Sequence, residues 1–230
     1  MKIKMVVFDM AGTTVDEDNV VYKTLQEAIV QHSIAITLDE VLKHGAGKEK
    51  LQAIVDILEH TNHPSSSELV KQIYNYFIDK LTINYKTLEI KALPNVEKVF
   101  KELIDRNIKV VLNTGYNRET AETLIKKLGW ELSVDYDLLV TASDVKQNRP
   151  QPDMIISAMS ELNISDPAGI IKVGDSAVDI FEGKNANCGL NIGITTGAQT
   201  REQLSEANPD YIIDDLYSII ELIDSMNNIA

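Results

Sequence analysis

The sequence predicts an α/β protein: a doubly wound parallel sheet with an all-helical cap inserted after its first strand. Short apolar runs alternate with helix-period segments from residue 92 onward, and parallel strands require such crossover connections. An earlier stretch of roughly 70 residues has helix-period apolar positions but no strand character. The 230 residues, 44% of them hydrophobic, suffice to bury a core of this kind without disulfides.

The first strand is expected at Met5 to Phe8, an apolar run that stops at Asp9, as buried parallel strands do. A glycine-bearing segment then turns the chain as far as Asp16. Thr37 and Glu40 have the spacing of a capping box, which predicts a helix start within the helical stretch. We expect further helices there over residues 21–29, 48–58 and 70–81.

After this stretch, Pro94 occupies the first position of a predicted helix. Five more strands are then expected, at residues 108–112, 138–141, 170–173, 190–194 and 211–213. The intervening helices begin near residues 117, 152, 175 and 200, and a last one follows residue 215. The economical division is a core of residues 1–16 and 92–230 with a cap of residues 17–91.

Composition excludes several classes of protein. The net charge is −13, and so acidic a surface repels phosphate backbones, which excludes nucleic acid as an expected partner. No stretch approaches the roughly 20 apolar residues of a spanning helix, so no membrane is expected. The lone Cys188 cannot form an intramolecular bridge, and we expect a cytoplasmic protein. A homodimer is compatible with the sequence but not required by it.

Four segments at predicted strand ends or helix starts carry polar side chains. In open α/β sheets ligands bind beyond the carboxyl ends of the strands, so these segments are the places to look for a site. Each alone is also explained by turn and cap preferences. Their occurrence together, in this order, favours one shared site: Asp9 to Thr14, Asn113 to Tyr116, Arg149 to Pro152 and Gly174 to Asp179.

The acidic members of this set predict a metal site. Asp9, Asp175 and Asp179 would converge at one sheet edge, where three carboxylates repel unless a cation joins them. A small number of hard oxygen ligands suits Mg²⁺, with waters and a substrate phosphoryl group completing its shell.

The remaining members predict a phosphoryl-binding site. Thr114 and Gly115 precede a helix, so their N–H groups and hydroxyl would face a phosphoryl oxygen with a favourable dipole. Arg149 supplies a fixed cation. A carboxylate such as Asp9, held beside the phosphorus, can attack it and form an aspartyl-phosphate. The expected partner is therefore a small anionic phosphate or phosphonate.

With these four motifs in order across the whole core, the sequence resembles the haloacid dehalogenase superfamily. The resemblance implies a Rossmann-like core with Asp9 as the nucleophile. It also implies that Thr114 and Arg149 bind the phosphoryl group. Mg²⁺ would be held by Asp9, the Ala11 carbonyl and Asp175, with Asp179 supporting it directly or through water.

Two departures from the usual superfamily pattern resemble the phosphonatase branch, phosphonoacetaldehyde hydrolase and its relatives. Ala11 stands where a second aspartate usually serves as general acid, and Arg149 stands where lysine is usual. In that branch a cap lysine forms a Schiff base with the substrate carbonyl, so no acid is needed for an oxygen leaving group. Lys48, in Gly45-Ala46-Gly47-Lys48, matches its Gly-x-x-Lys, although most lysines are solvated surface residues.

Three further residues bear on this interpretation. Leu51 stands where the branch carries a histidine, and His44 beside the loop is a candidate for that proton-shuttling role, or a solvated bystander. Tyr116 matches the branch and is a candidate for a hydrogen bond to the substrate carbonyl, or for packing under the cap.

The leading hypothesis is a Mg²⁺-dependent hydrolase of a 2-oxoalkyl phosphonate, with Lys48 as the imine-forming amine. A phosphatase of a small phosphomonoester is the alternative, although Ala11 forfeits the 10²–10⁴-fold typical of general acid catalysis. A regulatory protein that binds a phospho-ligand is the third hypothesis, and the intact set of site residues speaks against it.

Overall fold

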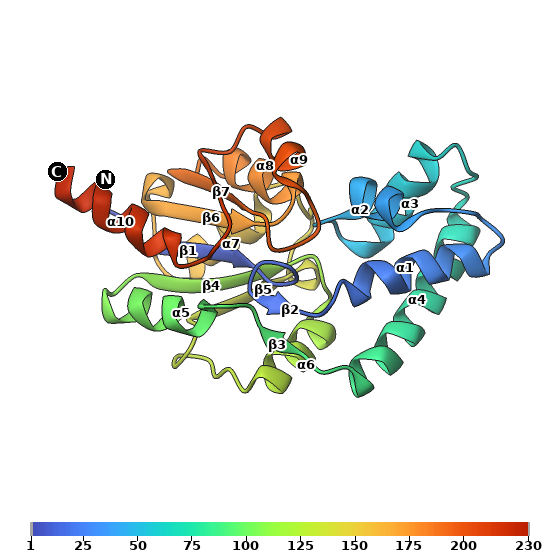
Figure 1. Ribbon diagram of the computed structural model, residues 1–230, viewed down its shortest axis with the longest axis horizontal. Helices are drawn as coiled ribbons and strands as arrows, with labels where there is room; N and C mark the ends of the chain where they lie inside the picture. Colours follow the sequence, from blue (N-terminus) through green and yellow to red (C-terminus); the bar gives the residue numbers. More distant parts are fainter. Residues whose placement is uncertain (1, 230) are drawn as a thin grey trace.

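The computed structural model describes residues 2–229 (Figure 1). Six strands form one parallel sheet in the order β5-β4-β1-β6-β7-β8. All six strands expected from the sequence are confirmed. Their bounds are β1 Met5–Asp9, β4 Lys109–Thr114, β5 Leu138–Thr141, β6 Ile170–Gly174, β7 Leu190–Ile194 and β8 Tyr211–Ile213.

Helices cover both faces of this sheet, and the alternation along β1 shows how. Val6 and Phe8 point into one apolar cluster, which includes Phe100 of helix α5 (Val96–Asp105). Met5 and Val7 belong to a second cluster beneath helix α7 (Asp153–Glu161). Both faces of β1 are therefore buried, which explains its continuous apolar sequence. The core helices are α5 Val96–Asp105, α6 Arg118–Leu128, α7 Asp153–Glu161, α8 Ala177–Asn185, α9 Arg201–Glu206 and α10 Ser218–Ile229, with 3₁₀ turns at Ala142–Asp144 and Pro167–Gly169.

The cap, as we call the helical unit of residues 20–87, extends beyond the carboxyl end of β1, opposite the two termini (Figure 1). It consists of α1 Val20–Gln31, α2 Leu38–Gly45, α3 Lys50–His60 and α4 Ser67–Thr87. The predicted capping box at the start of α2 is present: Glu40 N donates to the Thr37 hydroxyl at 3.2 Å, and Thr37 N donates to Glu40 Oε2 at 2.8 Å.

The two connections between core and cap pair with each other. β2 (Val15–Asp16) and β3 (Lys91–Ala92) form a two-stranded antiparallel sheet. Two residues are too few to show a period, so the sequence did not predict these strands. The proposed domain boundaries at 16/17 and 91/92 fall on this pair and remain a prediction.

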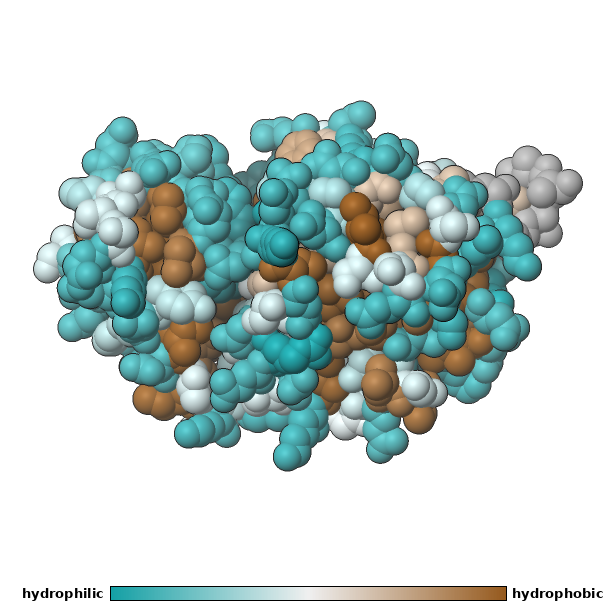
Figure 2. Space-filling model, turned by 180° about the vertical axis from the view of Figure 1, so that it is seen from behind, coloured by the Kyte–Doolittle hydropathy of each residue, from teal (hydrophilic) through white to brown (hydrophobic). Residues whose placement is uncertain are grey.

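In the view from behind, a notch at the upper edge separates the cap from the larger core (Figure 2). Hydrophilic side chains cover most of this face. Among residues 2–229, no helix is both long enough and apolar enough to cross a membrane.

The capping box leads to a stability prediction. Thr37→Ala removes one side of it and should lower the free energy of unfolding by about 1 kcal/mol, measured by urea denaturation. Thr37→Ser keeps the hydroxyl and should retain most of the stability. Equal losses in both variants would show that the hydroxyl does not cap α2.

Candidate active site

Three buried carboxylates meet at the carboxyl ends of β1 and β6, as the sequence predicted. Asp9 ends β1, Asp175 follows β6, and Asp179 lies in the first turn of α8. One oxygen of each lies within 4.8 Å of the others. Burial first, and then the charge of neighbouring aspartates, raises the pKa of Asp9 and of Asp175.

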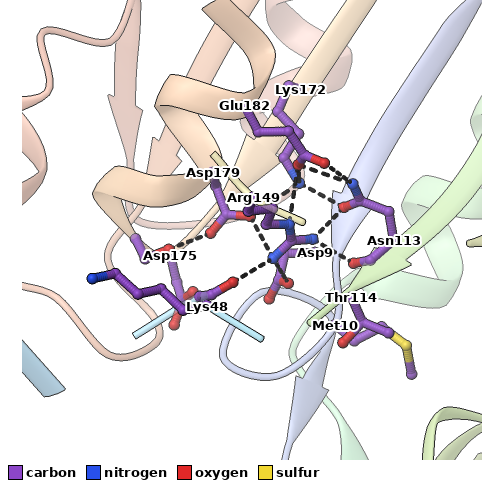
Figure 3. A network of polar contacts seen from close by, with 12 residues as sticks. Asp9, Met10, Lys48, Asn113, Thr114, Arg149, Lys172, Asp175, Asp179 and Glu182 are labelled. Atoms are coloured by element: carbon purple, nitrogen blue, oxygen red, sulfur yellow. Dashed lines mark hydrogen bonds and ion pairs between the residues drawn. The ribbon is translucent and has the colours of Figure 1, made fainter. Parts of the chain in front are cut away.

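Two buried cations face this cluster (Figure 3). Arg149 Nη1 lies 2.6 Å from Asp9 Oδ1 and 2.9 Å from Asp179 Oδ1. Lys172 Nζ, from the middle of β6, lies 3.0 Å from the same Asp179 oxygen. Burial acts to raise the pKa of Asp179, but Arg149 and Lys172 outweigh it and hold this pKa below its ordinary value.

A fourth carboxylate and an amide complete the network. Glu182 Oε2 lies 3.0 Å from Arg149 Nε and 3.2 Å from Lys172 Nζ. Asn113 donates from Nδ2 to both Glu182 oxygens at 2.9 Å, and its Oδ1 accepts from Lys172 at 2.6 Å and from Arg149. Every polar group of the Asn113 amide is thereby engaged, which orients both cations toward the aspartates.

Asn113 belongs to one of the four strand-end segments identified in the sequence, but no role was predicted for it, and Lys172 and Glu182 were not predicted as site residues. The available signal was Lys172 itself, a charged residue in the otherwise apolar run of β6, where an unpaired lysine would be very costly.

The charge balance of this network fits a divalent cation. Four buried carboxylates face two buried cations, which leaves two formal negative charges in a region closed to water. Uncompensated charge at such depth is unfavourable. Asp9, Asp175 and Asp179 would hold Mg²⁺ through oxygen atoms, which that ion prefers. Ala11, two residues after Asp9 and buried, is the further candidate ligand through its carbonyl.

The turn after β1 passes very close to the Asp175 side chain. Gly12 adopts φ +80°, and a Cβ there would overlap the Asp175 carboxylate. The Thr14 hydroxyl donates to the Asp9 carbonyl at 3.0 Å, which holds the turn against the strand end. Glycine is therefore needed at residue 12 for steric and conformational reasons alike.

The predicted phosphoryl-binding residues lie at the end of β4. Thr114 is buried, and its hydroxyl accepts a hydrogen bond from Tyr116 N at 3.2 Å. Gly115 lies against the cap, since a Cβ on it would come within 2.8 Å of the Lys48 carbonyl oxygen. Helix α6 follows, with its start near residue 117 as predicted, and the Asn117 side chain caps it by accepting from Thr120 N.

The loop between α2 and α3 closes over these residues. Gly47 has φ +72°, and a Cβ on it would overlap the Ser176 hydroxyl. Arg149 Nη1 donates to the Gly47 carbonyl at 3.4 Å. Asp9 is 5% exposed and Arg149 4% exposed. A substrate therefore needs the cap to move before it can reach Asp9, and closure then excludes water.

Lys48 of this loop and Lys50, the first residue of α3, point in different directions. The Lys48 amine forms an ion pair with Asp56 of α3, and Figure 3 shows it directed away from Arg149 and Asp9. Lys50 is buried at 7% exposure, and its Nζ donates to the Lys48 carbonyl at 2.8 Å. The structure therefore brings Lys50, not the predicted Lys48, into the closed site.

Two tyrosines surround the Lys50 amine. Its Nζ lies 5.3 Å from the ring centroid of Tyr22 and 5.6 Å from that of Tyr116, distances typical of cation–π contacts. Burial lowers the pKa of Lys50, while the charges of Asp9 and Glu49 act against this shift. The sequence missed Lys50, although Gly47-Lys48-Glu49-Lys50 is a second Gly-x-x-Lys overlapping the one that was chosen.

The two residues predicted to line the substrate pocket, Tyr116 and His44, lie in different places. Tyr116 is buried in the site, and its hydroxyl lies 2.9 Å from that of Tyr85. His44 instead stacks on His60, with ring centroids 4.6 Å apart, and its pKa is lowered by partial burial and by the charge of His60. The structure does not bring His44 together with Lys50.

The comparisons with known proteins agree with this geometry. A doubly wound sheet with polar residues gathered at its strand ends places the chain among α/β enzymes whose ligands bind at that edge. Residues 3–187 match the family of haloacid dehalogenase-like hydrolases, and the chain belongs to that family. The resemblance stated from the sequence motifs is thus confirmed.

Relatives of more than one activity are similar to the chain. A phosphonoacetaldehyde hydrolase of Latilactobacillus sakei subsp. sakei is 30% identical over 204 residues, covering 84% of this chain and 75% of the relative. A pyrophosphatase PpaX of Oceanobacillus iheyensis is 24% identical, covering 97% and 98%. The crystal structure of a phosphonoacetaldehyde hydrolase-like protein from Oleispira antarctica superposes with a TM-score of 0.85 at 26% identity, covering 99% and 94%.

The carboxylate cluster leads to a prediction for metal binding. Mg²⁺ should raise the free energy of unfolding of the wild-type protein, because a ligand of the folded state stabilises it by mass action. Asp175→Asn removes a ligand and a charge, and it should abolish most of this increment. Thermal melts with and without Mg²⁺ measure it. An equal increment in Asp175→Asn would place the ion elsewhere.

A buried acid outside the cluster leads to a prediction for pH. Burial raises the pKa of Glu17 to about 7 from an ordinary 4.5. Between these values the folded state holds a proton that the unfolded state has released, so stability falls as pH rises. Relative to Glu17→Gln, the wild type should lose about 3 kcal/mol of unfolding free energy from pH 4 to pH 8. Parallel pH curves for the two proteins would contradict the shift.

Proposed function

We propose that this hydrolase cleaves the carbon–phosphorus bond of a small 2-oxoalkyl phosphonate, releasing phosphate and an aldehyde or ketone. The observation that carries the proposal is the Lys50 amine, buried in the same closed interior as Asp9. The similarity to proteins named phosphonoacetaldehyde hydrolase supports it.

Lys50 has the properties that an imine-forming amine needs. An amine must lose its proton before it attacks a carbonyl, and burial favours the neutral form. The Tyr22 and Tyr116 rings exclude water around it. We assign the imine to Lys50 rather than to Lys48, because the Lys48 amine is held by Asp56.

The carboxylate and the cations act on the other half of the substrate. One Asp9 oxygen forms a bond to phosphorus, and the carbon–phosphorus bond breaks with its electron pair moving into the protonated imine, which becomes an enamine. Water then releases phosphate from the aspartyl-phosphate. Arg149, with Thr114 and Gly115, would hold the phosphoryl oxygens. Mg²⁺, when bound, supplies positive charge that offsets the carboxylates and the phosphoryl group.

Ala11 is consistent with this division of roles. A phosphomonoester would leave as an alkoxide and would need a proton from an acid at this position, whereas the enamine leaving group needs none there. A phosphatase of a small phosphomonoester remains the second candidate. It is favoured by the similarity to pyrophosphatase PpaX along nearly the whole of both chains.

The direct test traps the imine. Treatment with phosphonoacetaldehyde and borohydride should attach a reduced two-carbon adduct to Lys50, located by peptide mass spectrometry. Lys50→Met should abolish the label and lower phosphate release roughly 10²-fold or more, since the electron sink is lost.

Lys48→Met, two residues away, is the matched variant and should still be labelled at Lys50. A label that disappears only in Lys48→Met would assign the imine to that residue. Phosphate release from phosphomonoesters, with no label on either lysine, would favour the second candidate.

A further inference from the structure

A chain of buried polar groups that the ion network does not use runs beside Lys50. The Tyr85 hydroxyl donates to Glu17 Oε2 at 2.7 Å, and the hydroxyls of Tyr85 and Tyr116 are 2.9 Å apart. All three residues are at most 3% exposed. The chain thus connects a buried carboxyl group to the tyrosine whose ring faces the Lys50 amine.

The three members of this chain come from three different parts of the fold. Glu17 lies between β2 and α1, Tyr85 lies in the last turns of α4, and Tyr116 follows β4 in the core. The Tyr85–Tyr116 contact therefore bridges cap and core, and the connected chain belongs to the closed arrangement. Val21 N also donates to Glu17 Oε2, at 3.1 Å, which holds the carboxyl group in place.

Imine formation at Lys50 needs a group that stores a proton. The ammonium must first give up a proton, and the carbonyl oxygen must later gain one in order to leave as water. Ala11 cannot serve, and His44 is stacked on His60 in the cap.

We propose that Glu17 stores this proton, taking it from Lys50 and returning it to the departing oxygen through the hydroxyls of Tyr85 and Tyr116. This inference rests on the proposed function. In the first stage the Lys50 amine, 5.6 Å from the centroid of the Tyr116 ring, passes a proton through one intervening water to the Tyr116 hydroxyl. Tyr116 passes its own proton to Tyr85, and Tyr85 protonates Glu17.

The amine then adds to the carbonyl carbon, and the resulting carbinolamine loses its hydroxyl group. In this stage the C–O bond breaks, the proton returns along the same hydroxyls, and water departs. The products are the protonated imine and one water, with no net proton gained or lost and no redox step. Glu17 acts through the two tyrosines and does not itself touch the reacting atoms, so it is a positioning residue and not a catalytic one.

The electrostatics of the chain suit this exchange. Burial raises the pKa of Glu17 to about 7 and lowers that of Lys50, and both shifts reduce the free-energy cost of moving a proton from Lys50 to Glu17. The tyrosines pass protons without ionising, because burial raises the pKa of Tyr85 and of Tyr116 well above the ordinary value. The titratable groups that act on Glu17 are Asp16 of β2, Tyr22 of α1, Lys50 of α3, Tyr85 of α4 and Tyr116 after β4.

The test is the rate of borohydride trapping at Lys50 with phosphonoacetaldehyde, measured in single turnover from pH 5 to 9. The wild type should show an ionisation near pH 7. Glu17→Gln keeps the shape of the side chain but stores no proton, and it should slow trapping about tenfold or more and remove this ionisation. Tyr85→Phe breaks the chain at a second point and should give the same flattened profile.

Asn84→Ala is the matched control. The Asn84 amide, next to Tyr85 in the sequence, donates to Thr24 at 2.9 Å between α4 and α1 and takes no part in the proton chain. It should keep the wild-type pH profile. Circular dichroism confirms that each variant is folded. An unlabelled wild type would overturn the proposed function and this inference together. Normal labelling of the wild type with an unchanged profile in Glu17→Gln and Tyr85→Phe would overturn this inference alone.

Discussion

The structure depends on an imbalance of buried charge at the carboxyl ends of β1, β4 and β6. Carboxylates in a region of low dielectric repel each other and are costly to desolvate unless cations and hydrogen bonds compensate them. Arg149 and Lys172 compensate part of the charge, and the Asn113 amide fixes both cations in place. The remaining negative charge would favour a divalent cation, which would in turn help to bind a phosphoryl group.

The cap converts this edge of the sheet into an enclosed interior. Close approach is achieved at two glycines, Gly47 on the cap and Gly115 on the core, where any side chain would separate the two units. The same closure brings a lysine amine over two tyrosine rings and connects Tyr85 to Tyr116. The amine that the proposed mechanism needs in neutral form and the carboxylate that it needs ionised thus share one site, each with its own set of neighbours.

Much of this could be predicted from the sequence because it follows from topology. The carboxyl ends of adjacent parallel strands meet at one edge, so Asp9, Thr114 and Asp175 had to lie close together once the strands were identified. The spacing of apolar residues predicted the six strands and the inserted helices, and the spacing of Thr37 and Glu40 predicted the capping box. Lys172 was overlooked, although a lysine within an apolar strand was itself a signal.

Other features depend on geometry that local patterns do not contain. Glu49 caps α3, so Lys48 lies outside the helix and Lys50 is its first residue; the direction of each amine depends on that start. Because each of the two lysines ends a Gly-x-x-Lys pattern, the sequence alone could not show which amine enters the site. Glu17 and Tyr85 are 68 residues apart, and Tyr85 and Tyr116 are 31 apart, so their hydrogen bonds are set by how the cap folds onto the core.

In the proposed mechanism a cap lysine and a core aspartate act on one substrate inside the closed site. A crystal structure of the adduct that borohydride traps before the carbon–phosphorus bond breaks, formed from a 2-oxoalkyl phosphonate, tests it most directly. We expect a covalent bond at Lys50 Nζ, with phosphorus about 3–3.5 Å from an Asp9 carboxylate oxygen. An adduct on Lys48, or a phosphonate group remote from Asp9, would contradict it.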